Sequence, residues 1–261
     1  MELNFDIQDI ISIVKDASLI MTSEEFSVYR KNGYSDIVTS CDIKVQDALC
    51  SALSTLAPAS GFLCEENDIN NRGTADMLWI IDPIDGTTNF ARGISNCCIS
   101  VALKVDGEVR MGVVYNPYMD ELYYAEKGRG AFLNGVKLNV SERIFADGIL
   151  CTAMSVYNKQ YAKVCSDIIY EAYCHCNDVR RFGTCALELC YLAAGRCDLY
   201  FEYRVQPWDY AAAFLILTEA GGCLTDGNDG HLQCDSPTML VGANNRVNHG
   251  ELLGIVQKYV K

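Results

Sequence analysis

Two aspartates lie three positions apart in the segment LWIIDPIDGTTNF, residues 78–90. The apolar run 78–81 predicts a buried strand, which is expected to end at Asp82 because the following Pro83 lacks the N–H that a continuing strand needs. Asp85 is then expected in a turn. Carboxylates at this spacing suit a hard cation such as Mg²⁺, which holds a substrate phosphate through one or two carboxylates and waters. The segment therefore predicts a magnesium site.

The small residues after Asp85 suit an anion. Gly86, Thr87 and Thr88 leave backbone N–H groups free to point at a phosphate oxygen. The same residues also fit an ordinary solvated turn, because the Asp side chain accepts hydrogen bonds from its own backbone and Gly tolerates the left-handed backbone conformation. This segment alone leaves the binding site and the plain turn open.

Three more acidic residues are candidates for the same site, and each also has an ordinary structural interpretation. Asp42 is expected in the first turn of a helix at 41–56 capped by Ser40, where a negative charge stabilises the helix. Glu65 comes directly after a short expected strand, a place typical of a solvated loop. Asp209 begins an apolar stretch that predicts a helix, where the usual role of Asp is that of an N-cap.

Composition and charge exclude some classes of function. The chain has 261 residues, of which 50% are hydrophobic, enough for a large core in one or two closely packed domains. A formal net charge of −13 argues against a nucleic-acid partner, because phosphate backbones require clustered Lys and Arg. An anionic small molecule stays possible, since a bound divalent cation can reverse the local field of an acidic pocket.

The fourteen cysteines are expected to be reduced. The chain opens MELNFDIQDII, without a basic or long apolar targeting segment, and shows no membrane-spanning run, so we expect a cytoplasmic protein without a membrane partner. Free cysteine packs as a small hydrophobe, which fits the cysteines in apolar stretches. The cluster Cys174-His175-Cys176 lacks a second half at zinc spacing, and we interpret it as the end of a surface helix.

The first half, residues 1–145, is expected to be an α+β layer that carries the metal site on an antiparallel sheet. Apolar spacing predicts an opening helix at 4–21, whereas the polar stretch 27–40 lacks periodicity and is interpreted as an exposed mobile segment. Short strands are expected at 61–64 and 78–81, and alternation predicts antiparallel strands at 96–105, 108–116 and 121–126.

The second half, residues 146–261, alternates strands with helices and is expected to be α/β, closely packed on the first half and completing its site. Strands are expected near 149–155, 179–182, 197–201 and 239–242, and helices near 159–173, 185–194, 209–220 and 251–259.

Long stretches of the chain resemble the inositol monophosphatase family. The likeness rests on WIIDPIDGTTNF at 79–90, on Glu65-Glu66 upstream, and on WDYAAAFLILTEAGG at 208–222, which are similar to the family's signature motifs. It runs nearly end to end. The resemblance implies a layered αβαβα sandwich, combining the α+β and α/β halves, of the inositol monophosphatase and sugar phosphatase type. It also implies a magnesium-dependent, lithium-sensitive phosphomonoesterase.

The resemblance implies a set of metal ligands. A first site would use Glu65, Asp82 and the backbone carbonyl of Ile84, and a second would use Asp82, Asp85 and Asp209. A third, weaker magnesium would be held mainly by Glu65 and waters, which gives two to three Mg²⁺ per site; Mn²⁺ is a possible substitute and Li⁺ an inhibitor. Gathering these acids requires cations, because two carboxylates about 4 Å apart repel by roughly 4 kcal/mol at an effective dielectric constant near 20.

The resemblance also implies roles around the phosphate. Glu65 and Thr87 would orient the attacking water, with Asp42 supporting Thr87, while Asp209 would act at the metals and face the substrate's ring. The phosphate would lie on the backbone N–H groups of the turn that carries Gly86, Thr87 and Thr88. The segment that carries Lys31 would be a mobile loop closing over the metals.

Further residues match positions that line the family's substrate pocket. These are Gly183, Thr184, Cys185 and Glu202. Arg204 departs from the pattern of animal inositol phosphatases, and we interpret it either as a contact to a second phosphate or acidic substituent or as a surface charge.

Three functions remain open from the sequence. The first is a phosphatase acting by direct water attack on inositol monophosphate or a related sugar or polyol phosphate. The second keeps the metal chemistry but changes the substrate to fructose 1,6-bisphosphate, to a nucleotide such as NADP or 3′-phosphoadenosine 5′-phosphate, or to histidinol phosphate. The third is a non-catalytic regulatory protein that retains the fold. The resemblance also suggests a homodimer.

Overall fold

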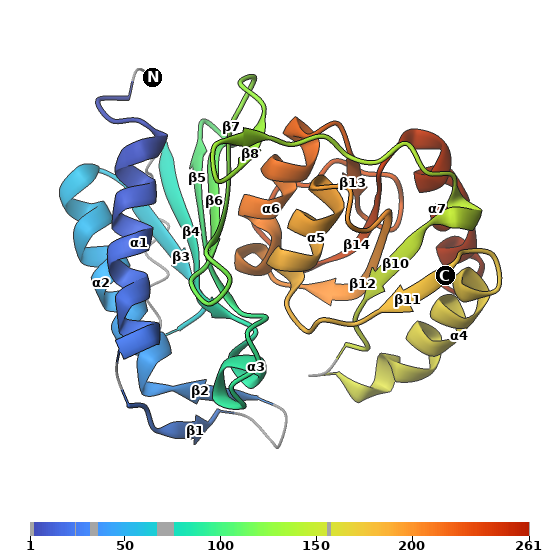
Figure 1. Ribbon diagram of the computed structural model, residues 1–261, viewed down its shortest axis with the longest axis horizontal. Coiled ribbons are helices and arrows are strands. Elements are labelled where there is room, and N and C mark those ends of the chain that lie inside the picture. Colours follow the sequence, from blue (N-terminus) through green and yellow to red (C-terminus); the bar gives the residue numbers. More distant parts are fainter. Residues whose placement is uncertain (1–2, 24, 32–35, 67–75, 156–157, 261) are drawn as a thin grey trace.

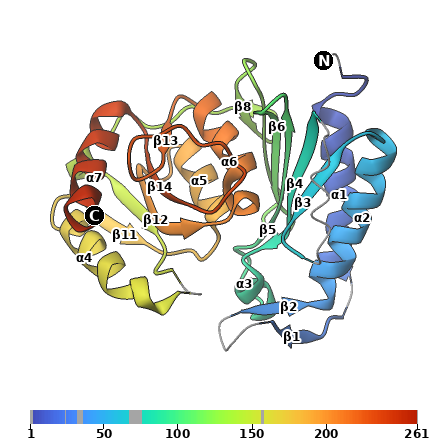
Figure 2. The same cartoon turned by 180° about the vertical axis from the view of Figure 1, so that it is seen from behind.

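Five layers make up the molecule in the computed structural model, which describes residues 3–23, 25–31, 36–66, 76–155 and 158–260. In Figure 1 the layers run from helices α1 and α2, through a first sheet, helices α5 and α6 and a second sheet, to helices α4 and α7. The view from behind in Figure 2 shows the same order. The αβαβα sandwich expected from the sequence is therefore confirmed.

The first sheet has seven strands in the order β3-β4-β5-β6-β7-β8-β9. Strand β3 runs parallel to β4, and every other neighbouring pair is antiparallel. The strands are β3 (Gly61–Cys64), β4 (Met77–Asp85), β5 (Cys98–Val105), β6 (Glu108–Asn116), β7 (Glu121–Glu126), β8 (Ala131–Leu133) and β9 (Val136–Lys137). The antiparallel sheet predicted from alternation is confirmed, whereas the short edge strands β8 and β9 were not predicted, because two or three residues are too few to show a period.

The second sheet has five strands in the order β11-β10-β12-β14-β13. Strand β10 lies parallel to both β11 and β12, and β14 runs antiparallel to β12 and β13. The strands are β10 (Ile149–Thr152), β11 (Asp178–Arg180), β12 (Leu199–Val205), β13 (Cys223–Thr225) and β14 (Thr238–Ala243). Strand β13 begins directly after Gly222, beyond the helix predicted near 209–220, and was not expected.

The helices cover the sheets according to their apolar faces. The outer helices are α1 (Ile7–Ser23), α2 (Ser40–Leu56), α4 (Ala162–Tyr173) and α7 (Arg246–Tyr259), each polar on one side. The middle helices α5 (Cys185–Ala193) and α6 (Pro207–Glu219) lie between the two sheets, and all nine residues of α5 are buried. A helix that is apolar all round must be buried on every side, which explains the run AAAFLIL in α6.

Short elements complete the chain. They are the strands β1 (Val28–Arg30) and β2 (Ile37–Thr39), the helix α3 (Thr87–Ala91) and the 3₁₀ turns η1 (Phe145–Asp147) and η2 (Lys159–Tyr161). Strands β1 and β2 form an antiparallel pair. The segment 27–40, expected to be exposed and mobile, thus contains two short strands: β1 is exposed as expected, whereas Val38 and Thr39 of β2 are buried, and 32–35 lie outside the described part.

Two helix caps differ from the prediction by a few residues. The N-cap of α2 is Thr39 rather than Ser40, and Asp42 is the third helical residue, whose side chain closes a capping box with Thr39. The N-cap of α6 is Gln206 rather than Asp209, because Pro207 takes the first helical position, which its fixed φ favours. Both carboxylates therefore lie one turn inside their helices.

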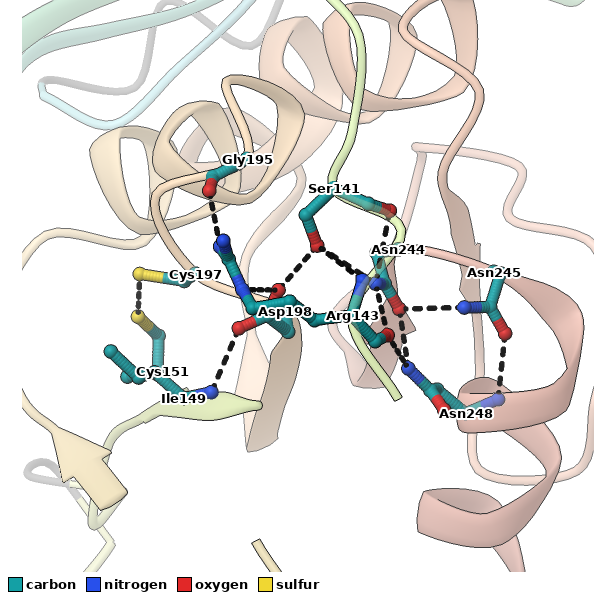
Figure 3. A network of polar contacts seen from close by, with 10 residues as sticks. All are labelled: Ser141, Arg143, Ile149, Cys151, Gly195, Cys197, Asp198, Asn244, Asn245 and Asn248. Carbon is teal, nitrogen blue, oxygen red and sulfur yellow. Dashed lines mark hydrogen bonds and ion pairs between the residues drawn. The ribbon is translucent and has the colours of Figure 1, made fainter. Parts of the chain in front are cut away.

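A buried carboxylate fixes the chain where it crosses from the first sheet to the second (Figure 3). Asp198 is wholly buried and accepts hydrogen bonds from Ser141 Oγ at 2.5 Å, Arg143 Nε at 2.9 Å and the backbone N–H of Ile149 at 2.9 Å. Asn244 Nδ2 donates to the carbonyl of Arg143 at 2.9 Å. The crossing segment is thus held against the start of β10 and the end of β14.

The cysteines and the helix ends agree with the sequence interpretation. All fourteen cysteines are free thiols. Helix α4 ends at Tyr173 and Cys174 is exposed, so the Cys174-His175-Cys176 cluster does end a surface helix. Among the described residues, no helix is both long and apolar enough to span a membrane.

Candidate active site

The motif at 78–90 forms a strand, a bulge and a tight turn. Strand β4 does not end at Asp82 as expected but continues to Asp85, which lies opposite Cys98 of β5. The register with β5 shifts between Asp82 and Asp85, so Pro83 lies in a bulge that does not require its missing N–H. The bulge brings both aspartates to the end of one strand.

Glycine is required at the turn that follows. Gly86 has φ of +88°, and a Cβ there would lie 3.0 Å from the carbonyl oxygen of Asn96. Helix α3 begins at the next residue, Thr87. The turn therefore places the backbone of Gly86 and Thr87 close to the carboxylates of β4, as the sequence predicted.

Backbone and side-chain donors orient the carboxylates of β4. Asp82 Oδ1 accepts from the N–H of Ile84 at 3.0 Å. Asp85 Oδ2 accepts from Thr184 Oγ1 at 2.5 Å and from the N–H of Ala186 at 2.7 Å. Asp82 Oδ2 and Asp85 Oδ1 take no part in these hydrogen bonds.

Thr87 and Asp42 are brought together from α3 and α2. The hydroxyl of Thr87 lies 3.2 Å from Asp42 Oδ1 and 3.1 Å from the carbonyl of Ile84. Asp42 is wholly buried, and its other oxygen accepts from the N–H of Thr39 at 2.8 Å. Burial raises the pKa of Asp42, although its bonds from Thr39 and Thr87 act in the opposite direction. Asp42 lies behind Thr87 and fixes its hydroxyl.

Glu65 follows β3 and faces a lysine. Lys31 Nζ lies 3.3 Å from Glu65 Oε1 and also pairs with Glu66 Oε1. Burial lowers the pKa of Lys31, but the charges of Glu65 and Glu66 outweigh it, and the net shift is upward. Gln46 accepts from the N–H of Glu66 at 2.9 Å and so anchors this loop to α2.

One cleft of about 390 Å³ contains most of the predicted site. Twelve predicted residues line it: Glu65, Asp82, Ile84, Asp85, Gly86, Thr87, Thr88, Gly183, Thr184, Cys185, Glu202 and Asp209. They come from both halves of the chain and from segments more than a hundred residues apart. Lys31 and Asp42 are not among the lining residues, but they contact Glu65 and Thr87, respectively.

The carboxylates of the cleft repel one another. Burial, followed by the charges of Glu65, Asp85 and Asp209, raises the pKa of Asp82 well above its ordinary value. Burial and the charges of Asp85 and Glu65 do the same for Asp209, and burial raises the pKa of Asp85 to about 6. Such a set of oxygen donors fits a divalent cation, which would remove the repulsion.

The carboxylates fit a metal ion by their chemistry and by their position around one cleft. Among the described residues, no three His, Cys, Asp or Glu side chains form a closed ligand group. The reason is visible in the contacts, because Asp85 is turned to Thr184 and Ala186, and Asp209 Oδ2 accepts from the N–H of Gln206 at 2.9 Å. The assignment of individual ligands therefore stays a prediction.

Comparison with known proteins decides the family. Residues 6–261 match the profile of the inositol monophosphatase family. The chain belongs to this family. It is 37% identical over 227 residues to an inositol-1-monophosphatase of Mesorhizobium japonicum. The aligned region covers 87% of this chain and 85% of the relative. The chain is 38% identical over 202 residues to the Nus factor SuhB of Escherichia coli strain K12, covering 77% and 76%.

A solved structure supports the same conclusion. The crystal structure of an IMPase/NADP phosphatase complexed with Mg²⁺ and phosphate has a TM-score of 0.86, with 26% identity, covering 95% of this chain and 93% of that one. The fold of the inositol monophosphatase family, expected from the motifs, is thereby confirmed for this member.

One predicted pocket residue of this family member lies elsewhere. Arg204 is exposed and lines a separate cavity of about 290 Å³ with Tyr203, Asp226 and Pro237. Strict alternation along β12 would place it on the same face as Glu202. The register between β12 and β14 shifts between Glu202 and Val205, and this irregularity turns Arg204 away. This position favours the interpretation of Arg204 as a surface charge over that of a contact to the substrate.

Several residues of the cleft were not found from the sequence. Asn89 Nδ2 donates to the carbonyls of Asn96 and Phe182, both at 2.7 Å, and so joins α3 to the second half. The position of Asn89 inside the motif at 78–90 could have identified it as a residue of the cleft. Glu188, Arg92, Lys159 and Arg181 also line the cleft. No local pattern marks them, because only the packing of the two halves brings them to one place.

Proposed function

We propose that this chain is a magnesium-dependent phosphatase that hydrolyses inositol monophosphate or a related sugar or polyol phosphate monoester. The observation that carries the proposal is the convergence of Glu65, Asp82, Asp85 and Asp209 on one cleft beside the Gly86-Thr87 turn. Membership of the inositol monophosphatase family supports a phosphoric monoester hydrolase.

The carboxylates are proposed to hold two to three Mg²⁺. Glu65, Asp82 and the carbonyl of Ile84 would form one site, and Asp82, Asp85 and Asp209 the other. Magnesium, when bound, supplies Lewis acidity that activates water and neutralises the phosphoryl oxygens. The Mg²⁺ and phosphate in the related IMPase/NADP phosphatase support this set. Substitution by Mn²⁺ and inhibition by Li⁺ follow from the same ligand chemistry and are part of the proposal.

Thr87 is suited to orient the attacking water. Its hydroxyl hydrogen is directed to Asp42 or to the carbonyl of Ile84, and the oxygen keeps lone pairs that accept from a water. Glu65 would accept the second hydrogen bond of that water. A water held by two acceptors presents its lone pair to the phosphorus for direct attack, so no covalent enzyme intermediate is needed.

The second half is proposed to bind the alcohol part of the ester. Glu202 and Asp209 line the cleft and can accept hydrogen bonds from ring hydroxyls. Tyr200 donates to Glu202 Oε2 at 2.7 Å and fixes its orientation, while burial raises the pKa of Glu202 to about 7. Gly183, Thr184 and Cys185 form the adjacent wall.

Phosphate release from a panel of monoesters, measured with Mg²⁺ and after chelation by EDTA, tests the proposal. We expect turnover that disappears on chelation and returns when Mg²⁺ is restored, with inhibition by Li⁺. Turnover that is unaffected by chelation would contradict it. Fructose 1,6-bisphosphate, NADP, 3′-phosphoadenosine 5′-phosphate and histidinol phosphate belong in the panel, because the same metal chemistry serves each of them.

The relatives named as Nus factors favour a second candidate, a regulatory role that does not depend on turnover. Replacing the chromosomal copy by the Asp209→Asn variant separates the two. Loss of the cellular function supports the phosphatase, whereas a function that survives the loss of turnover supports the regulatory role. A homodimer and a cytoplasmic location are proposed by analogy with the family.

A further inference from the structure

One face of α2 holds the backbone on either side of Glu65. Gln46 and Cys50 lie four positions apart in α2 and therefore share that face. The buried side chain of Gln46 accepts from the N–H of Glu66 at 2.9 Å and donates to the carbonyl of the same residue. Cys50 Sγ lies 3.8 Å from Sγ of Cys64. The residues directly before and after Glu65 are thus both in contact with α2.

The two thiols differ in their access to solvent. Cys64 ends β3 and is 1% exposed, whereas Cys50 lies on an outer helix and is partly exposed. The hydrogen bond between the thiols lowers the pKa of Cys50, although burial and the charge of Asp47 act in the opposite direction. The thiolate is the form of cysteine that reacts with oxidants. An accessible cysteine that ionises readily thus lies beside a second cysteine that can close a disulfide, an arrangement typical of redox sensors.

Contact between sulfur atoms does not by itself distinguish this pair. Cys151 and Cys197 in Figure 3 lie closer, with 2.9 Å between their Sγ atoms, but both are buried, at 0% and 3% exposed. The hydrogen bond between them and burial raise the pKa of Cys151. An oxidant in solution therefore reaches Cys50 more readily than it reaches either thiol of this second pair.

A disulfide between Cys50 and Cys64 would move the backbone at Glu65. The sulfur atoms would approach one another from 3.8 Å to about 2.05 Å. Cys64 is joined directly to Glu65, whose N–H donates to the carbonyl of Ile81 at 3.2 Å when the thiols are free. A displacement of about 1 Å in a group that positions a reactant can lower a rate about a hundredfold. The pair is therefore placed where its oxidation acts on the cleft.

We propose that Cys50 and Cys64 are a site of reversible oxidation, at which a disulfide forms and, by displacing Glu65, lowers turnover. The disulfide itself is independent of the proposed phosphatase function, whereas the loss of turnover rests on it. Under reducing conditions both residues are thiols, as in this structure, and the cleft keeps the geometry described above.

Hydrogen peroxide is the oxidant in the proposed step. The Cys50 thiolate attacks one peroxide oxygen, the O–O bond breaks, and the departing hydroxide takes up a proton and leaves as water. Cys50 is then a sulfenic acid. Sγ of Cys64 attacks Sγ of Cys50, the S–O bond breaks, and the hydroxyl group leaves as a second water with the proton of Cys64. The two thiols lose two electrons, which reduce one peroxide to two waters. A small thiol reduces the disulfide again by exchange.

Peroxide treatment of the full chain tests the proposal. The Mg²⁺-loaded protein is oxidised, its remaining thiols are blocked with N-ethylmaleimide, and it is digested without reductant for mass spectrometry. We expect peptides joined through Cys50 and Cys64, a fall in kcat/KM of about tenfold or more, and reversal of both by dithiothreitol. Cys50→Ser should form no such disulfide and should keep its turnover after the same treatment.

Two further variants complete the comparison. Cys174→Ser is the matched control, because Cys174 is exposed at the end of α4 in the second half of the chain. It should form the disulfide and lose turnover as the wild type does. Cys64→Ala removes the partner thiol and keeps a small side chain, so the sulfenic acid of Cys50 should persist and react with dimedone. Circular dichroism verifies that each variant is folded.

Three results overturn the inference while leaving the phosphatase intact. Oxidised wild type without the joined peptides would contradict the disulfide. Joined peptides with unchanged turnover would contradict the displacement of Glu65, and an equal loss of turnover in Cys50→Ser would assign the loss to another residue. If no substrate is turned over, the proposed function fails, and the joined peptides of the wild type still decide whether Cys50 and Cys64 are oxidised.

Discussion

At the scale of single residues, Asp209 is both part of the capping box of α6 and a proposed ligand of Mg²⁺. Its Oδ2 accepts from the N–H of Gln206, a bond that the amide oxygen of Asn can also accept. We predict that Asp209→Asn keeps the fold and lowers kcat/KM by roughly a hundredfold or more, because the charge that holds Mg²⁺ is lost. Phosphate release and circular dichroism check the two parts of this prediction.

Thermal unfolding gives an independent measure of the same change. Without metal, Asp209→Asn should melt at a higher temperature than the wild type, because repulsion by Asp85 and Glu65 is removed. With Mg²⁺ the wild type should gain stability and the variant should gain less. Equal Mg²⁺-dependent shifts in both proteins would show that Asp209 is not a metal ligand.

Glu188 holds the turn that carries Gly183 and Thr184. Its Oε1 accepts from the N–H groups of Phe182 at 2.7 Å and Gly183 at 2.9 Å, while Oε2 is buried without a partner among the described residues. Glu188→Ala should lower kcat/KM about tenfold and stability by about 1–3 kcal/mol, because two partly buried donors lose their acceptor. Glu188→Gln keeps an acceptor and should retain activity. If both substitutions behave alike, Glu188 does not act through the turn.

His249 gives a pH dependence that is separate from the cleft. It is buried and lies 2.9 Å from Thr225 Oγ1 through Nε2. Burial and the charge of Arg246 lower the pKa of His249, although Asp229 acts in the opposite direction. The unfolded chain therefore takes up this proton more readily, and stability falls as the pH drops below about 6.5. In urea titrations, His249→Gln should lose less stability than the wild type between pH 7 and pH 5.

At the scale of elements, the position of α6 depends on a close contact with β6. A Cβ at Gly112 of β6 would lie 2.6 Å from the carbonyl oxygen of Ala212 in α6. Gly112→Ala should therefore push α6 and its Asp209 away from the sheet, lowering stability by about 1–3 kcal/mol and reducing Mg²⁺-dependent activity. The matched control is Gly250→Ala in α7, where a Cβ meets nothing within 4 Å and should stabilise by up to about 1 kcal/mol. A Gly112→Ala protein with wild-type stability would show that the contact can relax.

Elements with a strong local signal were predictable, and those set by tertiary contacts were not. The apolar run of β4 and the all-apolar α6 were predictable, because a buried strand or helix can be recognised from its own apolar residues. Strands β1 and β2 have only three residues each and exist by pairing with one another. The two interpretations of Arg204 could not be separated from the sequence, because the register shift between Glu202 and Val205 breaks the alternation along β12. Arg92, Lys159 and Arg181 share a cleft only after the two halves pack, which no local pattern records.

At the scale of the whole molecule, one core joins the two sheets. Helices α5 and α6 pack on both of them, so buried residues such as Ile80 and Val114 of the first sheet and Tyr200 and Leu240 of the second belong to one cluster. Separating the halves would expose this cluster to water, at a cost of about 25 cal/mol for each Å² of apolar surface. The acidic cleft depends on the same arrangement, because its carboxylates come from both halves of the chain.

The shared core predicts that the two halves unfold together. The chain has two tryptophans, Trp79 buried between the first sheet and its outer helices, and Trp208 at the start of α6 in the second half. Trp208→Phe and Trp79→Phe each leave one reporter, placed in a different half. In each variant we expect the fluorescence and circular dichroism midpoints in urea to coincide, because neither half retains a complete core once the middle layer opens. Calorimetry of the wild type should correspondingly show a single transition whose van't Hoff and calorimetric enthalpies agree. If the Trp79 signal changed at a urea concentration clearly different from the loss of helical signal in the same protein, the first half would be an independent domain, and the cleft would open by separation of the halves without global unfolding.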